Sequence, residues 1–65
     1  MNENQFKGKW KEIKGKAKEK WGELTDDDLD RVEGQTDQLA GVIQQRYGRT
    51  QEEAKREVEE WRNGI

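Results

Sequence analysis

The spacing of the apolar residues near the amino terminus indicates the fold class of this chain. These residues recur at intervals of three or four positions, in the order Phe6, Trp10, Ile13, Ala17, Trp21 and Leu24. At about 100° per residue they fall on one stripe of a helix that is roughly 80° wide. The pattern predicts an amphipathic first helix that ends near Gly22.

Capping residues predict where this helix ends and the next one begins. Gly22 stands where a helix takes a left-handed carboxyl-terminal residue, and Thr25 is placed to cap a second helix with residues 26–28, all Asp, in its first turn. This second helix is short and weakens at Gly34. The apolar residues around and within it are Leu24, Leu29 and Val32.

Two more helices follow in the carboxyl-terminal half. The third is expected over Thr36–Tyr47 with Gly48 as its stop, and the fourth starts at Thr50, which forms a capping box with Glu53. The apolar face of the third comprises Leu39, Val42, Ile43 and Tyr47. The apolar face of the fourth comprises Ala54, Val58, Trp61 and Ile65.

With no proline and no alternating strand pattern, the chain is expected to be all-α. Four short helices joined by turns of a few residues favour antiparallel neighbours. The predicted fold is a small bundle of two packed helical hairpins, which forms a single domain over residues 1–65. The side chains expected in its core are Phe6, Trp10, Ile13, Trp21, Leu24, Leu29, Val32, Leu39, Ile43, Tyr47, Val58 and Trp61.

The composition predicts marginal stability. Of the 65 residues, 43% are charged and 28% hydrophobic, and there is no Cys or His for a disulfide or a zinc site. A domain of this size gains roughly 3–5 kcal/mol from its core. Gly8, Gly15 and Gly41 lie opposite the apolar stripes, where each costs about 1 kcal/mol relative to alanine. These glycines indicate either drift at surface positions or selection for conditional helicity.

The charges are distributed unevenly along the chain. Residues 6–22 carry seven lysines against two glutamates, whereas residues 23–65 carry six basic residues against twelve acidic ones. In the first helix one edge of the apolar stripe is flanked by Lys7, Lys11, Lys14 and Lys18. The other edge is flanked by Lys9, Lys16 and Lys20.

The lysines allow two interpretations. A helix with aromatic residues between two rows of lysines is typical of an anionic membrane surface, with Lys7, Lys11, Lys14 and Lys18 as the candidate contacts. Alternatively, the aromatic residues form the core and the lysines face the acidic helices. The core interpretation is favoured, because little core would remain without those residues. Nucleic acid is a further candidate partner, but the acidic remainder of the chain argues against it.

The sequence offers no residues suited to catalysis. Without His or Cys there is no tunable base or thiol nucleophile, and no glycine-rich phosphate loop is present. The alternate spacing of Asp26, Asp28 and Asp30 is that of a calcium loop, but Arg31 replaces the required glycine and Asp37 the final glutamate. No enzyme activity, metal or cofactor is therefore expected. Because no apolar run exceeds two or three residues, neither a signal peptide nor a spanning segment is expected, and the protein is expected in the cytoplasm. A monomer is also expected.

Several segments together resemble the CsbD-like bacterial stress proteins. They are residues 10–16 (WKEIKGK), 21–28 (WGELTDDD), 37–39 (DQL) with Gly34, and 43–48 (IQQRYG). The resemblance extends from Phe6 to Trp61 and implies a bundle of two helical hairpins, made during general or osmotic stress, with no established biochemical activity. The chain also resembles the hydrophilins, a compositional group linked to water loss.

Two functions follow as expectations. The first is a stress protectant that acts through weak contacts with proteins or membrane surfaces, without one defined partner. The alternative is an adaptor that binds anionic membranes or nucleic acid through its lysine-rich first helix.

Overall fold

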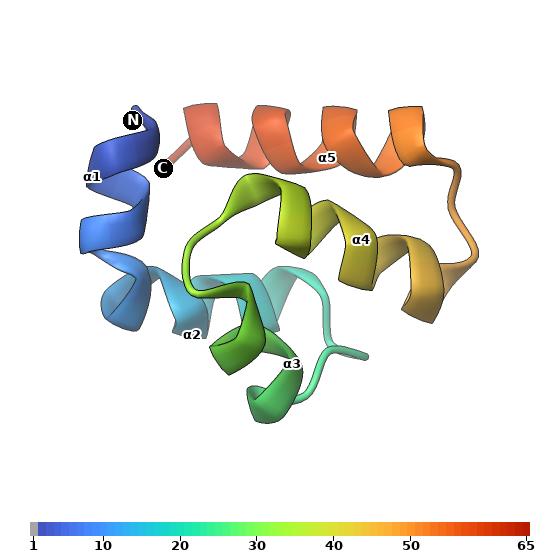
Figure 1. The fold of residues 1–65 in the computed structure, drawn as a ribbon, viewed down its shortest axis with the longest axis horizontal. Coiled ribbons are helices and arrows are strands. Elements are labelled where there is room, and N and C mark those ends of the chain that lie inside the picture. Colours follow the sequence, from blue (N-terminus) through green and yellow to red (C-terminus); the bar gives the residue numbers. More distant parts are fainter. Residues whose placement is uncertain (1) are drawn as a thin grey trace.

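The computed structural model describes residues 2–65, which form five helices and no strand. They are α1 (Glu3–Gly8), α2 (Trp10–Lys20), α3 (Asp26–Val32), α4 (Thr36–Tyr47) and α5 (Gln51–Asn63). The all-α prediction is confirmed, but the prediction of four helices is wrong. The expected first helix is divided into α1 and α2, which meet at a bend (Figure 1).

The bend lies at Lys9, whose backbone has φ −105° and ψ 12°. There the N–H of Glu12 donates to the Lys9 carbonyl at 2.9 Å, three residues back instead of four. The reason for the bend is tertiary packing, because it brings the fully buried Phe6 to Trp61 at the end of α5, with ring centroids 5.9 Å apart. Figure 1 shows α1 crossing the end of α5, close to the carboxyl terminus.

The start of α3 is as predicted, but the end of α2 is not. The Thr25 hydroxyl accepts from the Asp28 N–H at 3.1 Å, and the Asp28 carboxylate accepts from the Thr25 N–H at 3.2 Å. Gly22, however, is not left-handed: in residues 2–65 a positive φ occurs only at Glu33, Gly34 and Gly48. Helix α2 instead ends at Lys20, and the residue that follows, Trp21, has φ −119° and ψ 81°.

Helices α4 and α5 form the predicted carboxyl-terminal hairpin. Gly48 ends α4 with φ 65°, and the Thr50 hydroxyl caps α5 by accepting from the Glu53 N–H at 3.2 Å. The expected capping box is only half formed, because the Glu53 carboxylate accepts from the Thr50 hydroxyl and not from its N–H. In the amino-terminal half α1 packs on α2, and α2 packs on α3. Helix α3 also packs on α4 of the carboxyl-terminal hairpin. This half is therefore a three-helix unit and not a simple hairpin.

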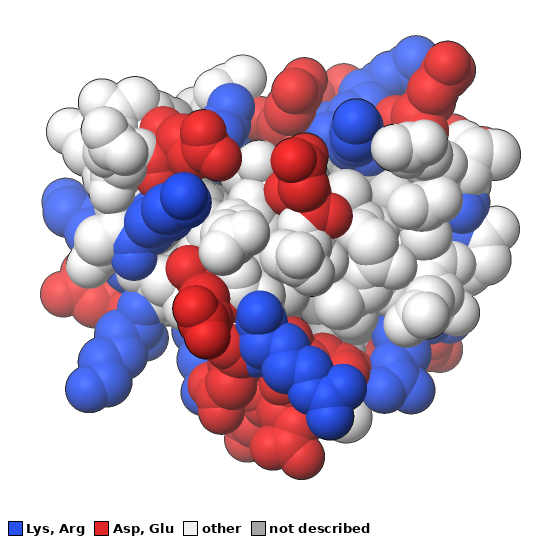
Figure 2. Space-filling view, in the orientation of Figure 1, with Lys and Arg blue, Asp and Glu red and all other residues white. Residues whose placement is uncertain are grey.

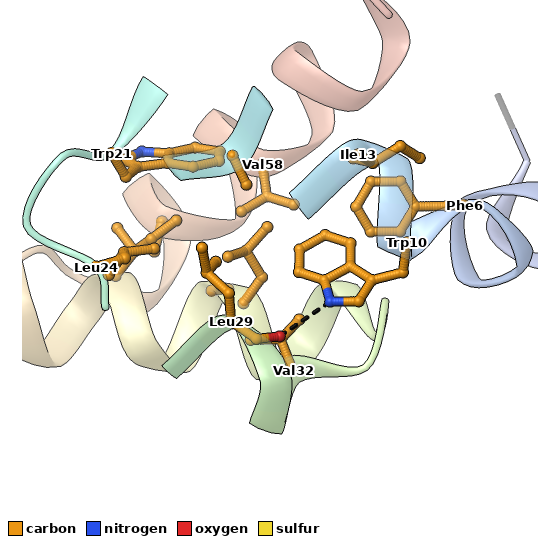
Figure 3. Packing of buried hydrophobic residues seen from close by; sticks show 13 residues of the cluster. Phe6, Trp10, Ile13, Trp21, Leu24, Leu29, Val32 and Val58 are labelled. Carbon is orange, nitrogen blue, oxygen red and sulfur yellow. Dashed lines mark hydrogen bonds between the residues drawn. The ribbon is translucent and has the colours of Figure 1, made fainter. Parts of the chain in front are cut away.

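The core lies where the five helices meet, and Figure 3 shows its side chains from close by. Of the side chains expected there, Tyr47 and Trp61 are partly buried and all the others are buried. The indole N–H of Trp10 donates to the Leu29 carbonyl at 2.9 Å, which satisfies the polar atom of a buried ring. No large hydrophobic side chain is exposed in the described chain.

Candidate functional site

The lysines of α2 lie in two rows, and α3 packs against one of them. In that row the Lys14 ammonium lies 2.5 Å from the Asp30 carboxylate, and that of Lys18 lies 3.0 Å from Asp26. Asp30 raises the pKa of Lys14 above its usual value by accepting its hydrogen bond, and Lys18 lowers the pKa of Asp26 by donating a hydrogen bond to its carboxylate. Half of the candidate surface-binding lysines are thus engaged within the molecule.

The other two candidates, Lys7 and Lys11, are exposed and form no ion pair within residues 2–65. Lys7 has a structural role through its backbone, because a Cβ on Gly34 would lie 2.7 Å from the Lys7 Cα. This close approach joins α1 to the turn before α4. The four candidates therefore do not form one uniform surface.

The row on the opposite edge of α2 consists of Lys9, Lys16 and Lys20. All three are exposed, and in the part of the chain that the structure describes none forms an ion pair. We call these three residues the open lysine row. The short connection after α2 places the acidic start of α3 near the last turns of α2, but the edge of α2 against which α3 packs is seen only in the fold.

The acidic side chains of α3 point to different cationic partners. Asp26 and Asp30 contact lysines of α2, whereas Asp28 contacts Arg46 of α4. Within residues 2–65 no group of three His, Cys, Asp or Glu side chains is arranged to hold a metal ion. Figure 2 shows the result as intermixed acidic and basic side chains over the lower part of the molecule, where α3 lies.

Asp28 is the one polar side chain buried among the described residues. Arg46 donates to its two oxygens, at 3.1 Å from Nε and 3.2 Å from Nη2. These hydrogen bonds, followed by the one from the Thr25 N–H, hold the pKa of Asp28 below its usual value. Asp28 thus connects the cap of α3 to the last turn of α4.

Tyr47 and Gly48 also have structural roles. The Tyr47 hydroxyl accepts from the Glu23 N–H at 3.1 Å, which fixes the connection between α2 and α3. Gly48 supplies the left-handed end of α4. The Arg-Tyr-Gly sequence at residues 46–48 therefore joins the two halves of the bundle.

A second polar junction lies beside this sequence. The Glu57 carboxylate of α5 accepts from the Trp21 indole N–H at 2.8 Å and pairs with Arg49 at 2.9 Å. The Arg49 guanidinium lies 5.5 Å from the centre of the Tyr47 ring. These contacts tie the end of α2 to the hairpin of α4 and α5.

A small hollow lies between α4 and α5. It has a volume of about 110 Å³ and is lined by Thr36, Asp37, Lys55, Val58 and Glu59. Pockets for small-molecule ligands are commonly about 300–1,000 Å³. The charged surface, and not this hollow, is consequently the candidate functional site.

No helix in residues 2–65 is long and apolar enough to cross a membrane. The fold and the surface define a small, highly charged helical protein whose ion pairs lie largely between its own helices. The family model for CsbD-like proteins matches residues 4–56, and the chain belongs to this family. Membership implies a general stress-response protein. No curated protein and no solved structure matches the chain.

Proposed function

We propose that this protein is a non-enzymatic stress protectant of the cytoplasm that acts as a monomer through weak contacts with other macromolecules. The observation that supports it most is the surface: 43% of residues are charged and no large hydrophobic side chain is exposed in residues 2–65. Such a surface is strongly hydrated and remains soluble at high concentration. The family assignment supports a role in stress.

Weak contacts follow from the way the charges are arranged. Carboxylates of α3 form ion pairs with Lys14, Lys18 and Arg46. On that side of the molecule the opposite charges largely cancel, so the net electrostatic potential is small. A hydrophilin-like protectant does not have to recognise one specific structure in the macromolecules that it protects. Its activity should therefore depend on concentration and tolerate changes of single surface charges.

Protection of a freeze-labile enzyme tests this proposal. The enzyme is frozen and thawed with increasing amounts of the protein, and its residual activity is measured. We expect dose-dependent protection that is unchanged when Lys9, Lys16 and Lys20 are all replaced by Gln. Protection no better than that of a folded protein of similar size and charge, at equal mass, would contradict the proposal.

The second candidate function is an adaptor for anionic membranes that works through the lysine-rich helices α1 and α2. The open lysine row favours it, because its three exposed ammonium groups have no ion-pair partner within residues 2–65 and remain available to phosphate headgroups. Nucleic acid is a weaker candidate, since the acidic helices α3 and α5 would repel it.

Vesicle binding separates the two candidates. Each lysine near an anionic bilayer contributes about 1 kcal/mol, so replacing Lys9, Lys16 and Lys20 by Gln should weaken an adaptor by about two orders of magnitude. The matched control replaces Lys14 and Lys18, which already have carboxylate partners. The adaptor is excluded if native binding to anionic vesicles is absent, or if it does not weaken as added salt shortens the Debye length below about 8 Å.

A further inference from the structure

Helix α1 is attached to the rest of the bundle mainly by one side chain. Phe6 is fully buried and lies 5.4 Å from the Trp10 ring and 5.9 Å from the Trp61 ring, measured between centroids. Phe6 is the one buried residue of α1, and no ion pair in residues 2–65 joins α1 to another helix. The Lys7 backbone also lies close to Gly34. Removal of Phe6 from its site would therefore free the whole helix.

The bend between α1 and α2 needs little change to straighten. Lys9, at φ −105° and ψ 12°, lies in the bridge region next to helical values, and its N–H still donates to the Gln5 carbonyl at 3.0 Å. Its carbonyl already accepts the helical bond from the Ile13 N–H at 2.9 Å. The apolar stripe also continues in one helical register through both helices. The sequence thus favours a continuous helix that packing against α5 prevents.

We propose that α1 moves as a flap about a hinge at Lys9. In the open form α1 and α2 make one continuous amphipathic helix, and this form binds an anionic bilayer. The proposal goes beyond the protectant role and does not depend on it. In the open form Phe6 leaves the core and uncovers parts of the Trp10 and Trp61 rings that it contacts. Figure 3 shows Phe6 beside Trp10.

Charge complementarity identifies the bilayer as the partner. Lys7, Lys9 and Lys11 are the chain neighbours of Phe6 and Trp10, and all three are exposed without an ion-pair partner within residues 2–65. Aromatic side chains at the acyl boundary with lysines reaching the headgroups are the arrangement by which interfacial helices bind. Within residues 2–65 the closed form exposes no large apolar side chain, so insertion of the aromatic residues into a bilayer requires the flap to open.

A proline that fits only the bent form tests the proposal. Lys11 is the second residue of α2, where proline is tolerated because first-turn N–H groups lack helical partners, whereas in a continuous helix the same position is interior. The matched control Lys11→Gln loses the same charge. We expect Lys11→Gln to weaken binding to phosphatidylglycerol vesicles by about fivefold. Lys11→Pro should weaken it by at least about tenfold more.

A distance measurement on the otherwise native chain provides a second readout, which holds even if Lys11→Pro does not fold. The chain has no cysteine, so spin labels can be placed uniquely at Asn4→Cys in α1 and Asn63→Cys at the end of α5. A six-residue helix is about 9 Å long, so opening should lengthen this distance by about 10 Å on phosphatidylglycerol vesicles and leave it unchanged on phosphatidylcholine.

The outcomes separate the flap from simple surface attraction. Binding to anionic vesicles without lengthening, or equal binding by Lys11→Pro and Lys11→Gln, would overturn the flap while leaving the adaptor function in place. Absence of binding to phosphatidylglycerol vesicles would overturn both, and the freeze-protection assay would be unaffected by either result. Lengthening together with the loss in Lys11→Pro establishes the proposal.

Discussion

Asp28 differs from the other acidic residues of α3 in burial and in its number of partners. Its side chain is 11% exposed, whereas that of Asp26 is 63% exposed. Asp28 accepts hydrogen bonds from Arg46 and from the N–H of Thr25, and Asp26 contacts only the flexible Lys18 ammonium. Exposed ion pairs typically contribute less than about 1 kcal/mol, while a buried charge with several hydrogen bonds is costly to disrupt.

The first prediction compares these two aspartates. Asp28→Asn should lower the free energy of unfolding by about 1–3 kcal/mol, because it leaves the Arg46 guanidinium without its anionic partner. Asp26→Asn, the matched control on the same helix turn, should have a much smaller effect because the pair of Asp26 with Lys18 is exposed. Urea denaturation followed by Trp fluorescence measures both. Equal effects would show that the contact with Arg46 contributes no more than a surface pair.

The second prediction concerns acid. The Arg46 guanidinium, and then the Thr25 N–H, hold the pKa of Asp28 below its usual 3.8. The stability from this interaction is therefore present above pH 3.8 and is lost as the pH falls through the lower pKa of the folded protein. Melting temperatures of the native protein should fall steeply below about pH 4, and those of Asp28→Asn less steeply. Parallel curves would contradict this assignment.

At the level of the helices, the sequence predicted the capped helix ends better than it predicted the bend between α1 and α2. The Thr25 cap and the stop at Gly48 depend on residues within one turn, and both are present. The local signal for the bend at Lys9 is weak: Gly8 precedes it, but no proline or apolar mismatch interrupts the stripe there. It results from the contact of Phe6 with Trp61, which are far apart in the sequence.

The third prediction concerns the glycines within helices. Gly8, Gly15 and Gly41 have no positive φ, and an added Cβ at any of them would meet nothing within 4 Å. Replacing each by Ala should raise the free energy of unfolding by up to about 1 kcal/mol. Thermal melts of the single variants measure the effect. A loss of stability at Gly15 or Gly41 would contradict the helical-propensity argument.

At Gly34 the expected effect of alanine has the opposite sign. The backbone there has φ +78°, and an added Cβ would lie 2.7 Å from the Lys7 Cα. Gly34→Ala should destabilise the protein, because both the backbone conformation and the contact with α1 exclude a side chain. The same Gly-to-Ala change thus has opposite signs at buried and open positions. A stabilising Gly34→Ala would show that α1 is not packed as described.

For the whole molecule, the candidate site was less predictable than the core. Apolar periodicity identified most of the buried side chains, since burial of a helix face follows from its register. It missed the buried Ala40, and the predicted core residues Tyr47 and Trp61 are only partly buried. Which lysine row is open depends on the side of α2 against which α3 packs. Periodicity within one helix does not contain that information, so the pairs of Lys14 with Asp30 and Lys18 with Asp26 appear only in the fold.

The fourth prediction follows from the small size of the core. Ile43 is fully buried, and Ile43→Ala should cost about 2–5 kcal/mol, comparable to the whole stability expected of so short a chain. Most molecules should then be unfolded at 25 °C, with loss of the helical circular dichroism signal. Val42→Ala, at the partly buried neighbouring position, is the control and should leave the fold intact.

The contact of Phe6 with Trp61 places the two described ends of the chain side by side, a geometry that suits circular permutation. A short linker could join them, and new termini could be opened after Gly48, in the turn between α4 and α5. All helices would keep their sequences, but α1 would be tethered at both ends. Such a permutant would restrict the motion of α1 through chain connectivity alone, with every side chain of the core and of both lysine rows unchanged.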